Sequence, residues 1–175
     1  SYASTFDLLL MQTCEEPSLA KGGVMNEGEV AARLGLAGIP AMAETIMLER
    51  DIRLLEATGG RLHASHLSTR ESFDAVRRAK LRGLKLTAGA APHNFALNEL
   101  DVGDYRTFAK VKPPLRVEDD RKAVVDAIAD GTVDVISSAH SPQDPENKRL
   151  PFAQAGFGVI GPETLLPLAP ELFQN

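Results

Sequence analysis

The four histidines of this 175-residue chain all lie near the ends of segments with the character of β-strands. They are His63, His66, His93 and His140. Imidazole nitrogens bind metal ions and exchange protons near neutral pH. Any one histidine in such a place is more often a satisfied polar group. Four of four favour a metal or acid–base site built from several strand ends.

Other chemically capable groups follow the first of these segments. We interpret Glu15 and Glu16 as carboxylates of a loop or of the approach to a helix rather than as ligands. Cys14 has no adjacent basic partner, which indicates a small buried group rather than a nucleophile. His63 and His66 are three residues apart and point to opposite faces of a strand, so they chelate one metal only if the strand ends between them.

The elements that position these groups follow from the hydrophobic pattern. Short apolar runs predict strands at 6–12, 61–67, 84–88 and 133–137. Apolar spacing and end signals predict helices at 27–36, 40–58, 68–82, 118–129 and 163–172. A strand–loop–helix unit therefore recurs four times, which is typical of a parallel α/β sheet. Ligands of such sheets lie beyond the carboxyl ends of the strands.

Several residues mark the expected helix ends. Asn26 is a suitable N-cap for the first helix, and Gly59 ends the second. Ser68 and Glu71 have the spacing of a capping box, and Pro167 predicts a kink in the last helix. We expect the first strand to be buried and the stretches 89–115 and 138–160 to be long loops.

Composition limits the class of protein. Nineteen basic and 24 acidic residues give a net charge of −5, which argues against nucleic acid as the main partner. The 43% hydrophobic fraction is that of a globular chain, and there is no long apolar run of the kind that spans a membrane. The single Cys14 favours a reducing compartment, so we expect a cytoplasmic protein.

Seven segments of the chain resemble the class I dihydroorotases of the amidohydrolase superfamily. They are 15–20, 23–28, 33–36, 38–40, Lys110 with 113–116, 130–134 and 161–164. The resemblance covers nearly the whole chain in order. It implies a (β/α)8 TIM barrel, a zinc cofactor, and interconversion of N-carbamoyl-L-aspartate and dihydroorotate in pyrimidine biosynthesis. Family members are more than twice as long, so residues 1–175 correspond to roughly the second half of a single barrel domain.

The chain departs from the family at the positions that carry the metal chemistry. His66 matches a family zinc ligand. The family has another zinc-binding histidine where this chain has Thr13. Ala139 stands where the family has an aspartate that binds metal and acts as general acid and base. A hydroxyl is a poor zinc ligand and a methyl group can do neither task, so no residue is assigned a catalytic role.

The resemblance also indicates a substrate site. Lys112 replaces an asparagine that contacts substrate in the family, and His140 is retained from the last motif, followed by Gln143. We expect these three residues to contact N-carbamoyl-aspartate or dihydroorotate. Lys110, Lys112 and Arg116 are equally consistent with a solvated loop and with an anion site at the barrel mouth.

Three functions remain open. The first is a dihydroorotase-like protein with impaired or lost metal chemistry and a structural role, similar to the non-catalytic partners that some bacterial aspartate carbamoyltransferases need for assembly. The second is an active zinc enzyme whose site is rebuilt from Glu15, Glu16, His140 or Asp144. The third is a non-catalytic dicarboxylate-binding module. Because four βα units leave two sheet edges open, we also expect a homo-oligomer.

Overall fold

The main sheet has four parallel strands, as predicted. A computed structural model describes residues 2–168 of the chain. The strands are β1 (Leu9–Thr13), β4 (Arg61–Ser65), β5 (Leu86–Ala90) and β6 (Val135–Ile136), and they lie in the order β1-β4-β5-β6. All three pairings are parallel, with Thr13 opposite Ser65. Strand order thus follows chain order, which is the pattern of successive βα units in a barrel.

Helices connect and flank these strands. The longer ones are α4 (Met42–Thr58), α5 (Arg70–Leu81) and α7 (Glu118–Ala129). The shorter ones are α1 (Tyr2–Thr5), α2 (Pro17–Ala20), α3 (Glu29–Leu34), α6 (Pro92–Ala96), α8 (Pro145–Arg149) and α9 (Pro162–Leu168). Two 3-10 turns, η1 (Glu99–Val102) and η2 (Thr107–Ala109), and a two-stranded sheet of β2 (Met25–Asn26) with β3 (Gly38–Ile39) complete the described part.

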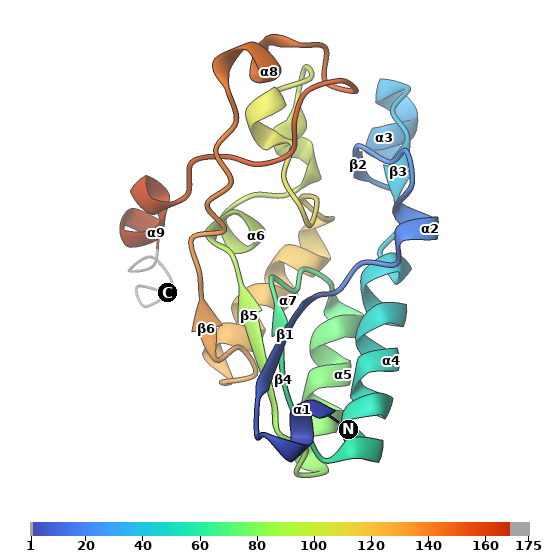
Figure 1. The fold of residues 1–175 in the computed structure, drawn as a ribbon. Coiled ribbons are helices and arrows are strands. Elements are labelled where there is room, and N and C mark those ends of the chain that lie inside the picture. Colours follow the sequence, from blue (N-terminus) through green and yellow to red (C-terminus); the bar gives the residue numbers. More distant parts are fainter. Residues whose placement is uncertain (1, 169–175) are drawn as a thin grey trace.

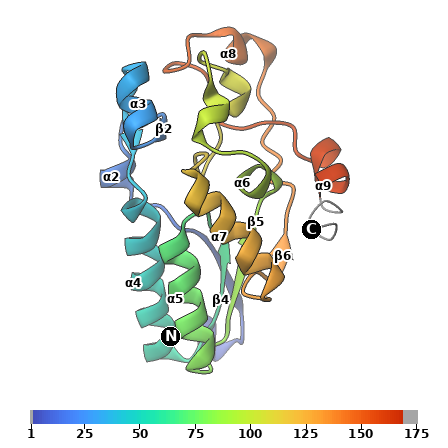
Figure 2. The same ribbon diagram turned by 180° about the vertical axis from the view of Figure 1, so that it is seen from behind.

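The three long helices pack side by side on one face of the sheet (Figures 1 and 2). Figure 2 shows α4, α5 and α7 in front of the strands, whereas Figure 1 looks onto the sheet from its other face. The main core lies between the sheet and these helices, where Leu48, Phe73, Val76 and Val124 are completely buried. Burial of this apolar surface is the main force that holds the helices to the sheet.

The expectation that the first strand is buried is wrong. Its apolar residues Leu9, Leu10 and Met11 are 47%, 55% and 68% exposed. Within the described residues β1 has a strand neighbour on one side only, and much of its surface therefore stays in solvent. The strand also begins three residues later than predicted, at Leu9.

Other strand boundaries differ by a few residues. The second strand ends at Ser65 rather than Leu67, because His66 takes a left-handed backbone conformation with φ of 53°. The third is β5 (Leu86–Ala90) rather than 84–88, and the fourth is reduced to β6 (Val135–Ile136). Each predicted strand nevertheless exists and lies where the pattern placed it.

Two helix starts differ because tertiary contacts take the capping side chains. Asn26 is buried in β2 and donates a hydrogen bond to Glu99, so Gly28 is the N-cap of α3 instead. The predicted capping box of Ser68 and Glu71 is also wrong. Thr69 caps α5 by accepting from the backbone N–H of Ser72, while Ser68 bonds to a different element.

Two other predicted helix bounds are confirmed. The bounds of α7 agree with the prediction, and α4 ends on Gly59 in the left-handed conformation as expected. The stretches expected to be long loops contain α6 and α8 and both 3-10 turns. The last helix is α9 (Pro162–Leu168) with Pro167 inside it, and residues 169–172 of the prediction lie outside the described part.

Candidate functional site

The carboxyl ends of the four strands meet at one edge of the sheet, where α2, α6 and the segment after β6 begin (Figure 1). Parallel pairing places all four ends on the same side, because each strand returns through a helix to the opposite edge. The candidate residues lie here: Thr13 ends β1, His66 follows β4, His93 lies in α6, and Ala139 with His140 follow β6. These residues therefore lie at one edge of the sheet, as the strand pattern predicts.

His66 is hydrogen-bonded to Ser137, a residue that the sequence argument did not single out. The Nε2 atom of His66 lies 2.7 Å from the hydroxyl oxygen of Ser137. Burial, together with nearby His63, lowers the pKa of His66 below its ordinary value. The imidazole is therefore neutral at pH 7. One of its two nitrogens is already engaged by a hydroxyl group.

His63 lies beside His66 because the strand ends between them. Its Nδ1 atom is 2.8 Å from the hydroxyl oxygen of Thr87 on the neighbouring β5. The ring of His63 also covers Gly89: a Cβ atom added there would lie 3.1 Å from His63 Nε2. A side chain at this position of β5 would push the ring away. Gly89 therefore makes room for the histidines over the sheet.

The residues present do not fit a catalytic zinc ion. Zinc in catalytic sites takes three protein ligands and a water molecule. Thr13 offers only a hydroxyl, Ala139 offers no donor, and His66 is bonded to Ser137. Within residues 2–168, no group of three or more histidine, cysteine or carboxylate side chains is placed to hold a metal ion.

His93 and Asn94 carry buried polar atoms without hydrogen-bond partners among the described residues. These atoms are Nε2 of His93 and both amide atoms of Asn94. Burial, with a smaller contribution from His66, lowers the pKa of His93 to about 4. His93 is therefore also neutral at pH 7. The histidines His66 and His93 bring no positive charge to the strand ends.

The three residues expected to contact substrate are each held by other protein groups. Lys112 donates to the carboxylate of Glu15 at 2.7 Å, so its charge is already paired. His140 accepts a hydrogen bond from the backbone N–H of Gly161 through Nδ1 at 3.2 Å. Gln143 is packed against Gly156, where an added Cβ would lie 2.6 Å from its side-chain oxygen.

Two further candidates have structural explanations, and a third is exposed. Glu16 caps α2 and accepts hydrogen bonds from both the backbone N–H and the hydroxyl of Ser18. Asp144 is exposed at the start of α8. Cys14 is 5% exposed, and burial raises its pKa to about 12, which makes the thiol a poor nucleophile. The interpretation of Glu16 and Cys14 as structural groups is confirmed.

Arg116 is a buried structural group rather than part of an open anion site. Its guanidinium donates to Ser68 Oγ, Asn26 Oδ1 and the carbonyl of Ile39 at 2.9–3.1 Å. It also faces the carboxylate of Glu44, 3.8 Å away. Arg116 is only 4% exposed, which leaves its guanidinium out of reach of a dissolved dicarboxylate.

Glu44, on α4, is the centre of this network and was missed by the sequence argument. Its carboxylate accepts bonds from the backbone N–H and hydroxyl groups of both Ser68 and Thr69, the residues that follow His66 and Leu67. Glu44 is 2% exposed. Glu44 is one of several acidic residues of α4, and nothing in the sequence of this helix distinguishes it from the exposed ones. The network fixes the backbone that carries His66.

Two buried lysines fasten the segments that follow the strand ends. Lys110 donates to the carbonyls of Phe152 and Ala153, and its ammonium lies 4.7 Å from the ring centre of Phe157. Lys148 donates to three carbonyl oxygens, of which Thr107 and Gly156 are the nearer. Lys110 therefore joins the segment before Pro113 to the segment after α8 and does not face solvent.

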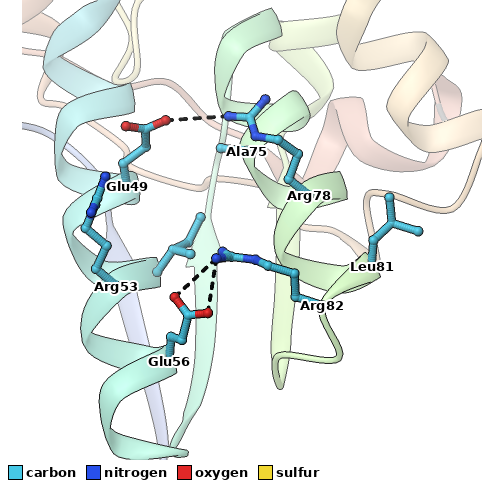
Figure 3. A pocket seen from close by; sticks show the side chains of 8 residues that line it. Glu49, Arg53, Glu56, Ala75, Arg78, Leu81 and Arg82 are labelled. Carbon is cyan, nitrogen blue, oxygen red and sulfur yellow. Dashed lines mark hydrogen bonds and ion pairs between the residues drawn. The ribbon is translucent and has the colours of Figure 1, made fainter.

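A separate groove of about 490 Å³ lies between α4 and α5, on the helical face away from the strand ends (Figure 3). It is lined by Glu49, Ile52, Arg53, Glu56, Ala75, Arg78, Leu81 and Arg82. Figure 3 shows two ion pairs bridging the helices across it, Glu49 with Arg78 and Glu56 with Arg82. Its opposite charges are largely paired, so the groove does not resemble an anion site.

Known proteins match this chain over nearly its whole length. Residues 1–72 match the family model described as dihydro-orotase-like. The chain is 48% identical over 174 residues to a dihydroorotase of Desulforapulum autotrophicum, covering 99% of this chain and 41% of that protein. It is 49% identical to a dihydroorotase of Desulfotalea psychrophila, with the same coverage. The chain thus spans about two fifths of the length of these curated relatives.

Solved structures show the same fold at low sequence identity. The L-hydantoinase (dihydropyrimidinase) of Arthrobacter aurescens superposes with a TM-score of 0.80 at 21% identity, covering 95% of this chain and 38% of that one. The dihydroorotase of Saccharomyces cerevisiae, in complex with 5-fluoroorotic acid, gives a TM-score of 0.76 at 18% identity, covering 98% and 45%. The parallel α/β sheet is consistent with part of such a TIM barrel.

No helix among residues 2–168 is both long and apolar enough to cross a membrane. The dihydro-orotase-like match and the relatives at 48–49% identity agree with the order of the strands and with the fold of the solved structures. The chain therefore belongs to the dihydroorotase-like family.

Proposed function

We propose that this chain is a dihydroorotase-family domain of pyrimidine biosynthesis whose metal-dependent hydrolysis is impaired or lost and whose role is structural. The observation that carries the proposal is the state of the three expected metal positions. Thr13 and Ala139 supply no zinc donor of the usual kind, and the retained His66 is bonded to Ser137 at 2.7 Å.

The charge of the strand ends supports the same proposal. N-carbamoyl-aspartate is a dianion and needs cationic groups for binding. The pKa values of His66 and His93 are lowered by burial, so both rings are neutral. Lys112 is paired with Glu15, and Arg116 is buried with Glu44. The described residues therefore offer little positive charge to a dicarboxylate.

A structural role implies a partner. We propose aspartate carbamoyltransferase, or further copies of this chain, as the partner, in a cytoplasmic assembly. The exposed apolar residues of β1, among them Leu10 and Met11, lie at a sheet edge that has no neighbour among residues 2–168. In a closed barrel this edge pairs with another strand of the same domain, so the proposal of a partner rests on the structural role and not on this edge.

The test uses the longest natural form of the polypeptide that contains this chain, purified with zinc present. We expect hydrolysis of dihydroorotate to be at least ~10²–10⁴ times slower than for an active family member assayed in parallel, since the general acid and base is missing. Co-expression with aspartate carbamoyltransferase, followed by analytical ultracentrifugation, should show a stable complex. Turnover comparable to the active enzyme, together with stoichiometric zinc, would refute the proposal.

A further inference from the structure

His66 and Ser137 form a bridge across the sheet. His66 follows β4, Ser137 follows β6, and β5 lies between these two strands in the sheet. The hydrogen bond of 2.7 Å therefore joins two strand ends that are not neighbours. It passes over the carboxyl end of β5, whose residues Gly89 and Ala90 are small enough to leave room for it.

The backbone near the bridge is fixed from both sides. On the β4 side, the N–H of Leu67 donates to the carbonyl of Gly89 at 2.8 Å, next to His66. On the β6 side, the N–H of Ser137 donates to the carbonyl of Ala90 at 3.1 Å. Both partners are thus anchored on the same end of β5, and the bridge needs little further ordering to form.

We infer that the Ser137–His66 hydrogen bond links two strand ends in this chain, as a shared metal ion links them in a zinc site. The domain therefore holds these strand ends together without metal. This inference rests on the proposed function and deepens it. A metal ion ties ligands from several strands to one point. Here a neutral imidazole and a neutral hydroxyl join β4 to β6 directly, and Ala139 and Thr13 leave no competing ligand.

The bridge also predicts how zinc binding could be restored. Replacing Ala139 by aspartate and Thr13 by histidine adds two donors, but His66 remains bonded to Ser137. The triple variant T13H/S137A/A139D removes that competing bond as well. We expect the triple variant to bind zinc more tightly than T13H/A139D, whereas a chain without the bridge would show no difference between them.

The experiment compares the wild-type protein in its longest natural form with Ser137→Ala, Ser137→Thr and the neighbouring Ser138→Ala. Ser138 is the matched control, because no side-chain hydrogen bond is recorded for it among residues 2–168. Thermal unfolding is followed with 1 mM EDTA and with excess zinc, and the ¹⁵N chemical shift of His66 Nε2 is measured by NMR. Ser137→Thr retains the hydroxyl and tests whether any effect comes from the bond itself.

We expect Ser137→Ala to lower the Tm by about 1–2 °C, because one typical hydrogen bond contributes about 1 kcal/mol and the resulting shift becomes smaller as the chain becomes longer. The Nε2 shift of His66 should move in this variant and stay in place in Ser138→Ala and Ser137→Thr. EDTA and zinc should leave the wild-type Tm unchanged. Unchanged Tm and Nε2 shift in Ser137→Ala, or a fall in wild-type Tm on adding EDTA, would overturn the inference.

These outcomes are distinct from those that test the proposed function. Turnover of dihydroorotate comparable to that of an active family member, with an intact bridge, would refute the proposed loss of catalysis but leave the bridge standing. Absence of turnover, together with an unchanged Tm and an unchanged His66 Nε2 shift in Ser137→Ala, would support the loss of catalysis and overturn the bridge.

Discussion

Glu44 should be the side chain on α4 whose loss destabilises the protein most. Its carboxylate accepts four hydrogen bonds from Ser68 and Thr69, at 2.5–3.2 Å, and lies 3.8 Å from Arg116. Glu44→Ala leaves the guanidinium of Arg116 buried without its counter-charge. It also leaves two backbone N–H groups without acceptors.

The magnitude follows from these two losses. Removing one partner of a buried ion pair costs about 3–5 kcal/mol, and each buried donor left without a partner costs about 1–3 kcal/mol. Because Arg116 keeps its bonds to Asn26 and Ile39, we take the lower end of each contribution and expect a total loss of about 5 kcal/mol. That is a large share of a typical total stability of roughly 5–15 kcal/mol.

The matched control is Glu49→Gln on the same helix. Glu49 pairs with Arg78 at 3.5 Å, and both side chains are about half exposed or more. An exposed pair contributes about 0–1 kcal/mol, so this variant should stay close to the wild type. Urea unfolding at pH 7, followed by circular dichroism, gives both free energies of unfolding. A loss of less than about 1 kcal/mol in Glu44→Ala would refute the reasoning about the buried network.

Four further predictions concern single groups. Arg121 holds the pKa of Glu118 down at about 2. This pair therefore stabilises the fold above pH ~4.5, and the stabilisation is lost as the pH falls toward 2. Glu118→Gln should remove that part of the pH dependence of the free energy of unfolding in urea. Burial lowers the pKa of Lys148 to about 8, so stability should rise with pH between about 8 and 10.5, and Lys148→Met should abolish the rise in the same assay. Cys14 should react with iodoacetamide at pH 8 only after denaturation; rapid labelling of the folded protein, detected by mass spectrometry, would contradict its burial. Ala139 has φ of 47°, so Ala139→Gly should raise the free energy of unfolding by about 1 kcal/mol, and a loss of stability on this substitution would argue against the left-handed conformation.

The sheet could be predicted from the sequence because each strand is marked by local signals. Apolar runs and glycine or proline boundaries place all four strands, and α7 is bounded by an acidic first turn and by Gly131. Capping could not be predicted as well. Asn26 and Ser68 are good caps locally, but Glu99 and Glu44, which are distant in the sequence, bind their side chains instead.

The sequence predicted where the residues of the candidate site lie, but it did not predict which groups they contact. The rule that ligands lie beyond parallel strand ends placed His66 and Ala139 at one edge of the sheet. The pairing of His66 with Ser137 depends on the left-handed turn at His66 and on the small residues of β5, which a strand pattern does not reveal. Lys112 and Arg116 looked similar in the sequence, yet one forms a partly exposed ion pair and the other is buried.

The backbone at Ala139 bears on how the strand end relates to the family. A positive φ is uncommon outside glycine, and among other residues aspartate, asparagine and histidine adopt it most readily. Ala139 has φ of 47°, although alanine gains nothing from this conformation and is strained in it. The resemblance places an aspartate at this position, and aspartate suits such a backbone. His66 also has a positive φ, of 53°, and histidine is one of the residue types that adopt this conformation readily. We infer that the turn after β6 keeps a backbone conformation that suits an aspartate, so that the proposed loss of acid–base chemistry concerns the side chain of residue 139 and not the backbone of the turn.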